Sequence, residues 1–147
     1  MKIRYAARLL IVDSANRVLL FRFVHHNDAL AGKSYWATLG GEVESGESFE
    51  QAAIRELHEE TGILLGDIGN IVEERTFEMM LPDGENVQAE ERFFIVKLDD
   101  VDINTEGWSN QERAVICHHH WWEIDELMVT TETVYPSDIP VILSRLF

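Results

Sequence analysis

Residues 41–63, GEVESGESFEQAAIRELHEETGI, contain the clearest helix signal in the chain and therefore decide the fold prediction. Ser48 followed three residues later by Gln51 is a capping box, which marks a helix start. Gly62 suits the helix end. We therefore predict an amphipathic helix over Ser48–Thr61. Its apolar side consists of Phe49, Ala52, Ala53, Ile54 and Leu57.

The same helix carries the acidic residues Glu56, Glu59 and Glu60. Spacings of three and four residues place them on one face, where like charges repel. A hard divalent cation bound by several carboxylate oxygens removes that repulsion, and Mg²⁺ also accepts waters and phosphates as ligands. The alternative is a solvated acidic face, the usual fate of charge runs. A preceding glycine pair, Gly40–Gly41, and the neighbouring Arg55 favour the metal-binding interpretation.

This stretch resembles the Nudix box of the Nudix hydrolases. Every fixed position of that pattern is present, namely Gly41, Glu47 after five residues and, after seven more, Arg55-Glu56-Leu57-His58-Glu59-Glu60-Thr61-Gly62-Ile63. One departure precedes the box, because Leu39 stands where many members have proline. The resemblance implies the α/β fold class, an α/β/α sandwich with a mixed β-sheet and a loop–helix–loop catalytic segment. It implies one domain over residues 1–147.

The resemblance also implies metal-dependent hydrolysis of a diphosphate linkage in a nucleoside diphosphate joined to another moiety. The substrate is then a small nucleotide (a nucleoside triphosphate, ADP-ribose or a nucleotide sugar), and the cofactor is Mg²⁺ or Mn²⁺. Relatives of this type are often homodimers. The alternative function is a Nudix-fold module that binds or senses a nucleotide without cleaving it. By position, the metal ligands are Glu56, Glu59, Glu60 and the carbonyl of Gly40, and the catalytic group is Glu59, Arg55 and Glu47.

Two of these roles stay open in the sequence. Glu47, which matches the partner of Arg55 in orienting the helix, can be structural rather than catalytic. The general base is Glu59 by first choice, with Glu106 and Glu112 as alternatives further along the chain. A base must reach the attacking water within hydrogen-bond distance, and spacing along the chain does not decide that.

The flanking segments predict an antiparallel-rich mixed sheet, because helices do not alternate regularly with strands. Short helices are predicted at Ile124–Met128 and at Pro136–Phe147, the second capped by Ser137. Two polar loops, His25–Ser34 and Asp99–Gln111, are expected to set substrate specificity. Strand patterns and turn residues predict strands at Tyr5–Val12, Val18–Val24, Ile71–Met80, Val87–Leu98 and Arg113–Trp122, with a short segment at Trp36–Glu44.

The charge balance restricts the binding partners. The net charge is −15, from 27 acidic and 12 basic residues, and no Lys/Arg cluster is present, which excludes a nucleic acid polymer as partner. A small phosphate ligand remains compatible when a divalent cation lies between it and the carboxylates. Arg4, Arg8 and Arg22 lie near the first predicted hairpin, where one of them can reach a phosphate, although solvated or paired arginines are more common.

The remaining signals are weaker. An N-terminal apolar run is too short and too interrupted for a signal peptide or a membrane span, so we expect a cytoplasmic protein without a membrane partner. Cys117 lies in an apolar stretch and is expected to be a buried thiol. His118 and His120 share a strand face, but a partly exposed strand is favoured over a zinc site. Trp121–Trp122 is expected to pack in the core.

Overall fold

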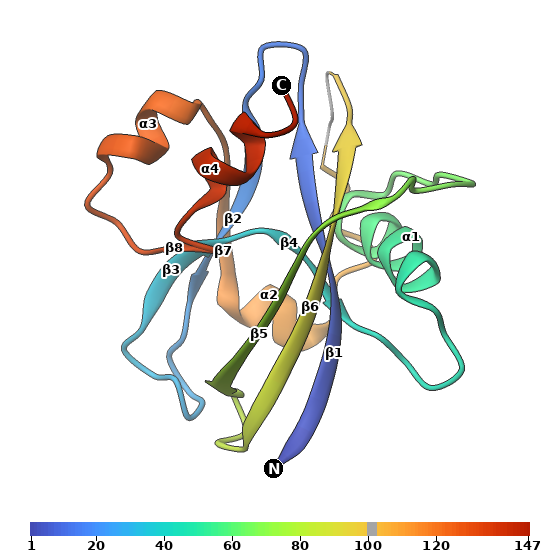
Figure 1. Ribbon diagram of the computed structural model, residues 1–147. Helices are drawn as coiled ribbons and strands as arrows, with labels where there is room; N and C mark the ends of the chain where they lie inside the picture. Colours follow the sequence, from blue (N-terminus) through green and yellow to red (C-terminus); the bar gives the residue numbers. More distant parts are fainter. Residues whose placement is uncertain (100–102) are drawn as a thin grey trace.

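The chain folds into one mixed β-sheet with helices on both of its faces, described over residues 1–99 and 103–147 in a computed structural model (Figure 1). The helices are α1 (Phe49–Thr61), α2 (Asn110–Val115), α3 (Ile124–Val129) and α4 (Ile139–Ser144). The strands are β1 (Lys2–Val12), β2 (Val18–Val24), β3 (Ser34–Ala37), β4 (Leu39–Glu42), β5 (Ile71–Met80), β6 (Asn86–Lys97), β7 (Ile116–Trp122) and β8 (Val134–Tyr135). The predicted sandwich with a mixed sheet is confirmed.

Strand β1 is the centre of the sheet. It pairs in parallel with β6 along its whole length and antiparallel with β4 on its other side. Its register with β2 consists of one pair, Val12↔Val18, after which β2 continues with β3 and β7 as neighbours. The sheet therefore opens into two halves beyond this pair, with β4 at the edge of one half and β7 in the other.

Side chains of β1 alternate between two hydrophobic cores, as expected for a strand buried on both faces. Ala7, Leu9 and Ile11 pack in the core that contains α1. Leu10 and Val12 pack in the core that contains α4. Because the apolar side of α1 packs against β1 in the first of these cores, the helix is fixed against the sheet. This packing positions the site described below.

Most predicted elements are confirmed with small shifts at their ends. The helix over α1 begins one residue after its cap, Ser48, whose capping box with Gln51 is formed. The Pro82-Asp83-Gly84 turn joins β5 to β6 as predicted. Trp122 is buried against Trp36, with ring centroids 5.2 Å apart, which confirms its packing role.

The prediction of one strand over Arg113–Trp122 is wrong in its first part. Residues 110–115 form α2, and the strand starts only at Ile116. Ser109 caps α2 through a box with Glu112, which satisfies the first helical amides. The loop predicted at Asp99–Gln111 is correspondingly shorter, and its residues 100–102 lie outside the described residues.

The C-terminal helix is also shorter than predicted. It begins at Ile139, after an N-cap at Asp138 whose side chain makes no cap hydrogen bond, so the predicted cap at Ser137 is wrong. Residues Val134 and Tyr135 pair with β3 as β8, and Pro140 lies in the first helical turn, where its fixed φ is tolerated. None of the helices described is long and apolar enough to span a membrane.

Cys117 is exposed, so its predicted burial is wrong. Side chains alternate along β7, and Ile116 takes the buried side while Cys117 lies against Arg22 of β2. His118, His119 and His120 are exposed as well, and His120 bonds Glu126, with Nε2 3.2 Å from a carboxylate oxygen. The histidines therefore lie on an exposed strand, which is the arrangement that the sequence favoured over a zinc site.

Candidate active site

Helix α1 is fixed against the sheet by its apolar side. Ala52, Ala53 and Leu57 are fully buried, and the helix contacts β4 and β1. At its end, Gly62 adopts a left-handed conformation with φ 82°, and its amide donates to the carbonyl of His58. The orientation of the glutamates on α1 is therefore set by core packing.

Two of these glutamates are buried, so the acidic side of α1 is not a solvated face. Glu56 is 8% exposed and Glu60 is 2% exposed. One oxygen each from Glu56, Glu60 and Glu112 lie within 4.8 Å of one another. Hard oxygen donors gathered in this way are the ligand set that Mg²⁺ prefers. Among the described residues this is the candidate metal centre.

Gly40 contributes to this centre through its backbone. Its amide donates to Glu60 at 3.0 Å, on the edge of β4 that faces away from β1. The sequence pointed to the carbonyl of Gly40 as a metal ligand, and that role stays a prediction. The structure places Gly40 directly beside the buried carboxylates.

The electrostatics of the cluster favour proton or cation binding. Burial raises the pKa of Glu60 well above its usual range, and the charge of Glu56 adds to this shift. The hydrogen bond from Gly40 acts in the opposite direction and lowers the pKa. Burial also raises the pKa of Glu56, although Arg55 opposes the shift. Without a cation the cluster therefore tends to hold a proton, because buried carboxylates this close do not all ionise readily.

Arg55 connects the other predicted residues to the cluster. Its guanidinium donates to Glu47 at 2.8 and 3.0 Å, to Glu56 at 2.9 Å and to Glu59 at 3.2 Å. It also donates to the carbonyl of Glu42 at 2.9 Å. The hydrogen bonds from Arg55 lower the pKa of Glu47, which therefore stays a carboxylate. Arg55 thus contacts Glu47, Glu56 and Glu59 at once, and the orienting or catalytic role of Glu47 and Arg55 stays a prediction.

The structure separates the candidates for the general base. Glu59 accepts a hydrogen bond from Arg55 beside the cluster and is partly exposed, with 39% of its side chain accessible. Glu112 belongs to the cluster itself. Glu106 is exposed in the turn that precedes α2, outside the cluster. The identity of the base stays a prediction, with Glu59 as the first choice and Glu106 and Glu112 as the alternatives.

The segment before α2 is anchored on the end of α1. The indole Nε1 of Trp108 donates to the carbonyl of Glu60 at 2.9 Å, and the amide of Asn104 donates to the carbonyl of Thr61 at 3.0 Å. Gly107 lies so close that a Cβ there would be 2.6 Å from the carbonyl oxygen of Glu59. These contacts place Glu112 beside Glu60. The pattern Ser109-x-x-Glu112, a capping box, is the sequence signal for this helix that the strand prediction passed over.

Gly41→Ala is expected to disturb the metal centre without unfolding the protein. A Cβ at Gly41 would lie 2.5 Å from Oε1 of Glu56, and its nearest neighbours are all atoms of that carboxyl group, so the Glu56 carboxylate must shift from its bond with Arg55 while the backbone can stay in place. We expect cation affinity to fall about tenfold or more, as it does when partners that orient metal ligands are lost. Isothermal titration with Mn²⁺ measures this change.

Gly66→Ala is the matched control for this variant, because a Cβ at Gly66 meets nothing within 4 Å. It should bind Mn²⁺ like the wild type. If Gly41→Ala also bound Mn²⁺ like the wild type, Glu56 would not be a metal ligand.

A cleft of about 390 Å³ lies next to α2. It is enclosed by the loop after β2, the β5–β6 turn and α2. The first two are joined by a hydrogen bond from the amide of Ala29 to the carbonyl of Pro82, 2.9 Å long. The volume is within the range of small-molecule sites. Polar and apolar side chains both line it, namely His26, Asn27, Asp28, Pro82, Asp83, Gln111, Ala114 and Val115.

Comparison with known proteins agrees with this geometry. The NUDIX domain pattern matches residues 2–143, which is nearly the whole chain. The chain belongs to the Nudix family. A search of curated proteins found no match.

Solved structures show the same fold at low sequence identity. The MutT protein from Methanosarcina mazei Go1 has a TM-score of 0.70 at 22% identity, over 98% of this chain and 92% of that one. A MutT NUDIX hydrolase from Burkholderia pseudomallei has a TM-score of 0.65 at 17% identity, over 100% of both chains. An ADP-ribose pyrophosphatase from Streptococcus suis 89-1591 has a TM-score of 0.60 at 12% identity, over 97% of this chain and 90% of that one.

Family membership and the complete box make the chain a Nudix-type pyrophosphohydrolase, an enzyme that acts on nucleotide derivatives. Its one departure before the box, Leu39, is fully buried in the core beside α1. The Leu39 side chain therefore packs in the core and belongs to β4, the strand that also carries Gly40. Leucine in place of proline takes no ligand away from the carboxylate cluster.

Proposed function

We propose that this Nudix enzyme, acting as a single domain over residues 1–147, cleaves a diphosphate linkage in a small nucleotide with the help of Mg²⁺ or Mn²⁺. The observation that carries the proposal is the buried cluster of Glu56, Glu60 and Glu112 next to Gly40. The substrate is a nucleoside diphosphate joined to a further group, such as a third phosphate or a sugar.

The residues of the cluster fit a divalent cation. Their donors are carboxylate oxygens, and burial and mutual repulsion raise the pKa values of Glu60 and Glu56, a cost that bound positive charge removes. Glu56, Glu60 and Glu112 would hold the ion, with Glu59 and the carbonyl of Gly40 as further ligands. When bound, the ion supplies positive charge to the phosphoryl oxygens and acidity to water.

The remaining residues of the box would position the reacting groups and remove a proton from water. Glu59 is the proposed general base, because it is partly exposed beside the cluster and its orientation is set by Arg55. Glu47 keeps Arg55 in place through two hydrogen bonds. Removing a proton from water as it attacks phosphorus is the step that Glu59 would perform, and such a base contributes about 10²- to 10⁴-fold to the rate.

The cleft beside α2 is where the nucleoside end of the substrate would lie. Helix α2 contributes Glu112 to the cluster and Gln111, Ala114 and Val115 to the cleft. A ligand in the cleft would thus contact the same helix that carries Glu112 of the carboxylate cluster. Polar side chains such as Asn27 and Asp83 can donate to or accept from a base or a ribose.

The test is release of phosphate and nucleotide from a panel of nucleoside triphosphates, ADP-ribose and nucleotide sugars. Each compound is assayed with Mg²⁺, with Mn²⁺ and with a chelator. We expect turnover of at least one compound with a metal ion and none with the chelator, because the carboxylates alone cannot neutralise phosphate charge. Turnover that persists in the chelator would contradict the metal role. Binding of a nucleotide without turnover of any compound would favour a sensing module.

A further inference from the structure

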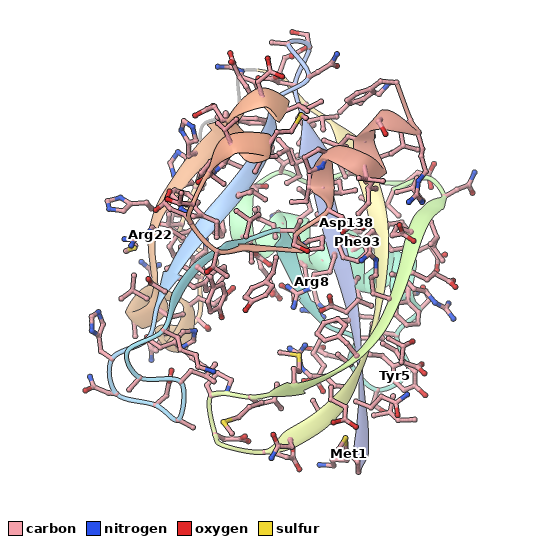
Figure 2. All side chains as sticks on the ribbon, turned by 60° about the vertical axis from the view of Figure 1, so that its left-hand side comes forward. Met1, Tyr5, Arg8, Arg22, Phe93 and Asp138 are labelled. Atoms are coloured by element: carbon pink, nitrogen blue, oxygen red, sulfur yellow. The ribbon has the colours of Figure 1, made fainter. Side chains whose placement is uncertain are left out.

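Arg4 and Arg8 lie on the face of β1 opposite α1. They occupy the same side as Leu10 and Val12, which pack in the core with α4. Figure 2 shows Arg8 near the middle of the molecule and Arg22 at its periphery. Arg22 has a long contact of 3.9 Å to the sulfur of Cys117. Of the arginines near the first hairpin, Arg4 and Arg8 are therefore the inward-facing ones.

Arg8 is a cation held in a fixed position. Its Nε donates to Glu91 at 2.8 Å, and the side chains of Arg8 and Glu91 are 18% and 8% exposed. Burial alone would lower the pKa of Arg8, but the charges of Glu91, Glu60 and Glu56 together raise it. The guanidinium thus stays charged, and the glutamates of the candidate metal centre are among the groups that act on it.

Arg4 has a donor that the described residues leave unused. Its Nη1 is buried and has no hydrogen-bond partner, while its Nε is 3.5 Å from the exposed Glu42. Burial and then the charge of Arg8 lower the pKa of Arg4, and the two side chains lie on the same face of β1. Ala6, whose small side chain is fully buried, lies between them on this face. An unpaired buried guanidinium donor is costly, and an anionic ligand would satisfy it.

Only β4 separates this pair from the metal centre. Arg8 is the register partner of Gly40 in the β1–β4 ladder, and the amide of Gly40 bonds Glu60 on the opposite edge. Neighbouring strands are about 4.8 Å apart. The two strands approach closely at this position, because a Cβ at Gly40 would lie 2.1 Å from the carbonyl oxygen of Ala7. A diphosphate that lies across Gly40 can therefore contact the glutamate cluster at one end and the arginines at the other.

We propose that Arg4 and Arg8 form an anion subsite that binds the phosphoryl group of the substrate on the far side of Gly40 from the glutamate cluster. The subsite rests on the proposed diphosphate hydrolysis. Its ligand is a phosphoryl group because the adjoining centre acts on one, and guanidinium groups suit phosphate oxygens geometrically. The glutamates hold one end of the diphosphate through a cation, and the arginines hold the other end directly.

The test is calorimetric titration with inorganic phosphate in the presence of a chelator. A single phosphate can contact the arginines without placing a second phosphoryl group beside the uncompensated glutamates. The wild type should bind, and Arg4→Gln should raise the Kd about tenfold or more, the effect of losing a hydrogen bond to a charged group. Arg22→Gln is the matched control, a partly buried arginine on the neighbouring strand that contacts Cys117, and should bind like the wild type. Unchanged binding by Arg4→Gln, or no binding by the wild type, would overturn the subsite.

Arg8 needs a paired variant, because Arg8→Gln alone would leave Glu91 buried and unpaired. The double variant Arg8→Gln with Glu91→Gln removes both charges and should also bind inorganic phosphate more weakly. On a substrate from the panel, Arg4→Gln should raise KM with little change in kcat, the pattern for binding energy shared by substrate and transition state.

These measurements separate the subsite from the hydrolase proposal. Weaker phosphate binding by Arg4→Gln, with no turnover of any panel compound by the wild type, would support the subsite and contradict the hydrolysis. Metal-dependent turnover whose KM is the same in Arg4→Gln and the wild type would support the hydrolysis and overturn the subsite.

Discussion

Glu60→Gln is expected to lower metal-dependent turnover by about 10³-fold or more, since a metal site supplies several kcal/mol of transition-state stabilisation and each 1.36 kcal/mol is a factor of ten. Glu60 is the most buried member of the carboxylate cluster, and Gln keeps its shape but loses its charge. Its amide oxygen can still accept the hydrogen bond from Gly40. Steady-state assays on whichever panel compound is turned over measure the effect.

The same substitution should stabilise the metal-free protein at neutral pH. The folded-state pKa of Glu60 is raised above its unfolded value, so the stability linked to its proton is fully present below the unfolded pKa, near 4.3. That stability is lost as the pH rises through the folded pKa. In a chelator, Glu60→Gln should therefore unfold at a higher temperature than the wild type at pH 7, and the difference should shrink towards pH 4.

Metal addition should reverse the order of stability. Saturating Mg²⁺ should raise the melting temperature of the wild type and have little effect on Glu60→Gln, because a ligand that binds only the folded state stabilises it. Glu50→Gln is the matched control, since Glu50 is an exposed glutamate in the first turn of the same helix. It should behave like the wild type in every assay. Activity of Glu60→Gln close to that of the wild type would contradict the assigned metal role.

The sequence predicted the parts of the site that are local in the chain. The capping box at Ser48 and the glycine stop at Gly62 fix the limits of α1, and the apolar positions fix its orientation. The burial of Glu56 and Glu60 was not readable from the same pattern, because charged residues at helical spacing usually face solvent. It depends on β4, where Gly41 leaves room for the carboxylate of Glu56.

The parts of the site that come from distant segments were harder to predict. Glu112 reaches the cluster only because the turn before α2 is anchored on the end of α1 through Trp108. The inward orientation of Arg8 depends on its pairing with Glu91, 83 positions away in the sequence. Such contacts follow from the register of β1 with β6, which hydrophobic patterns in a single strand do not specify.

The assignment of the general base gives the second large effect, and it depends on comparing Glu59→Gln with Glu112→Gln. Glu59 is the proposed base, so Glu59→Gln should lower kcat about 10²- to 10⁴-fold. Because Glu59 is only a further ligand, outside the three clustered carboxylates, the affinity for Mn²⁺ should change much less. Glu112 belongs to the buried cluster, so Glu112→Gln should weaken Mn²⁺ binding first and lose rate as a consequence.

The dependence of kcat on pH at saturating metal distinguishes the two roles. An enzyme that has lost its base loses the acidic limb of the profile, because that limb reports protonation of the base. Glu59→Gln should therefore show a rate that no longer falls at low pH, while Glu112→Gln at saturating Mn²⁺ should keep the fall. The opposite pattern, a lost acidic limb in Glu112→Gln and a retained one in Glu59→Gln, would assign the base to the helix that the Ser109 cap creates and leave Glu59 as a partner of Arg55.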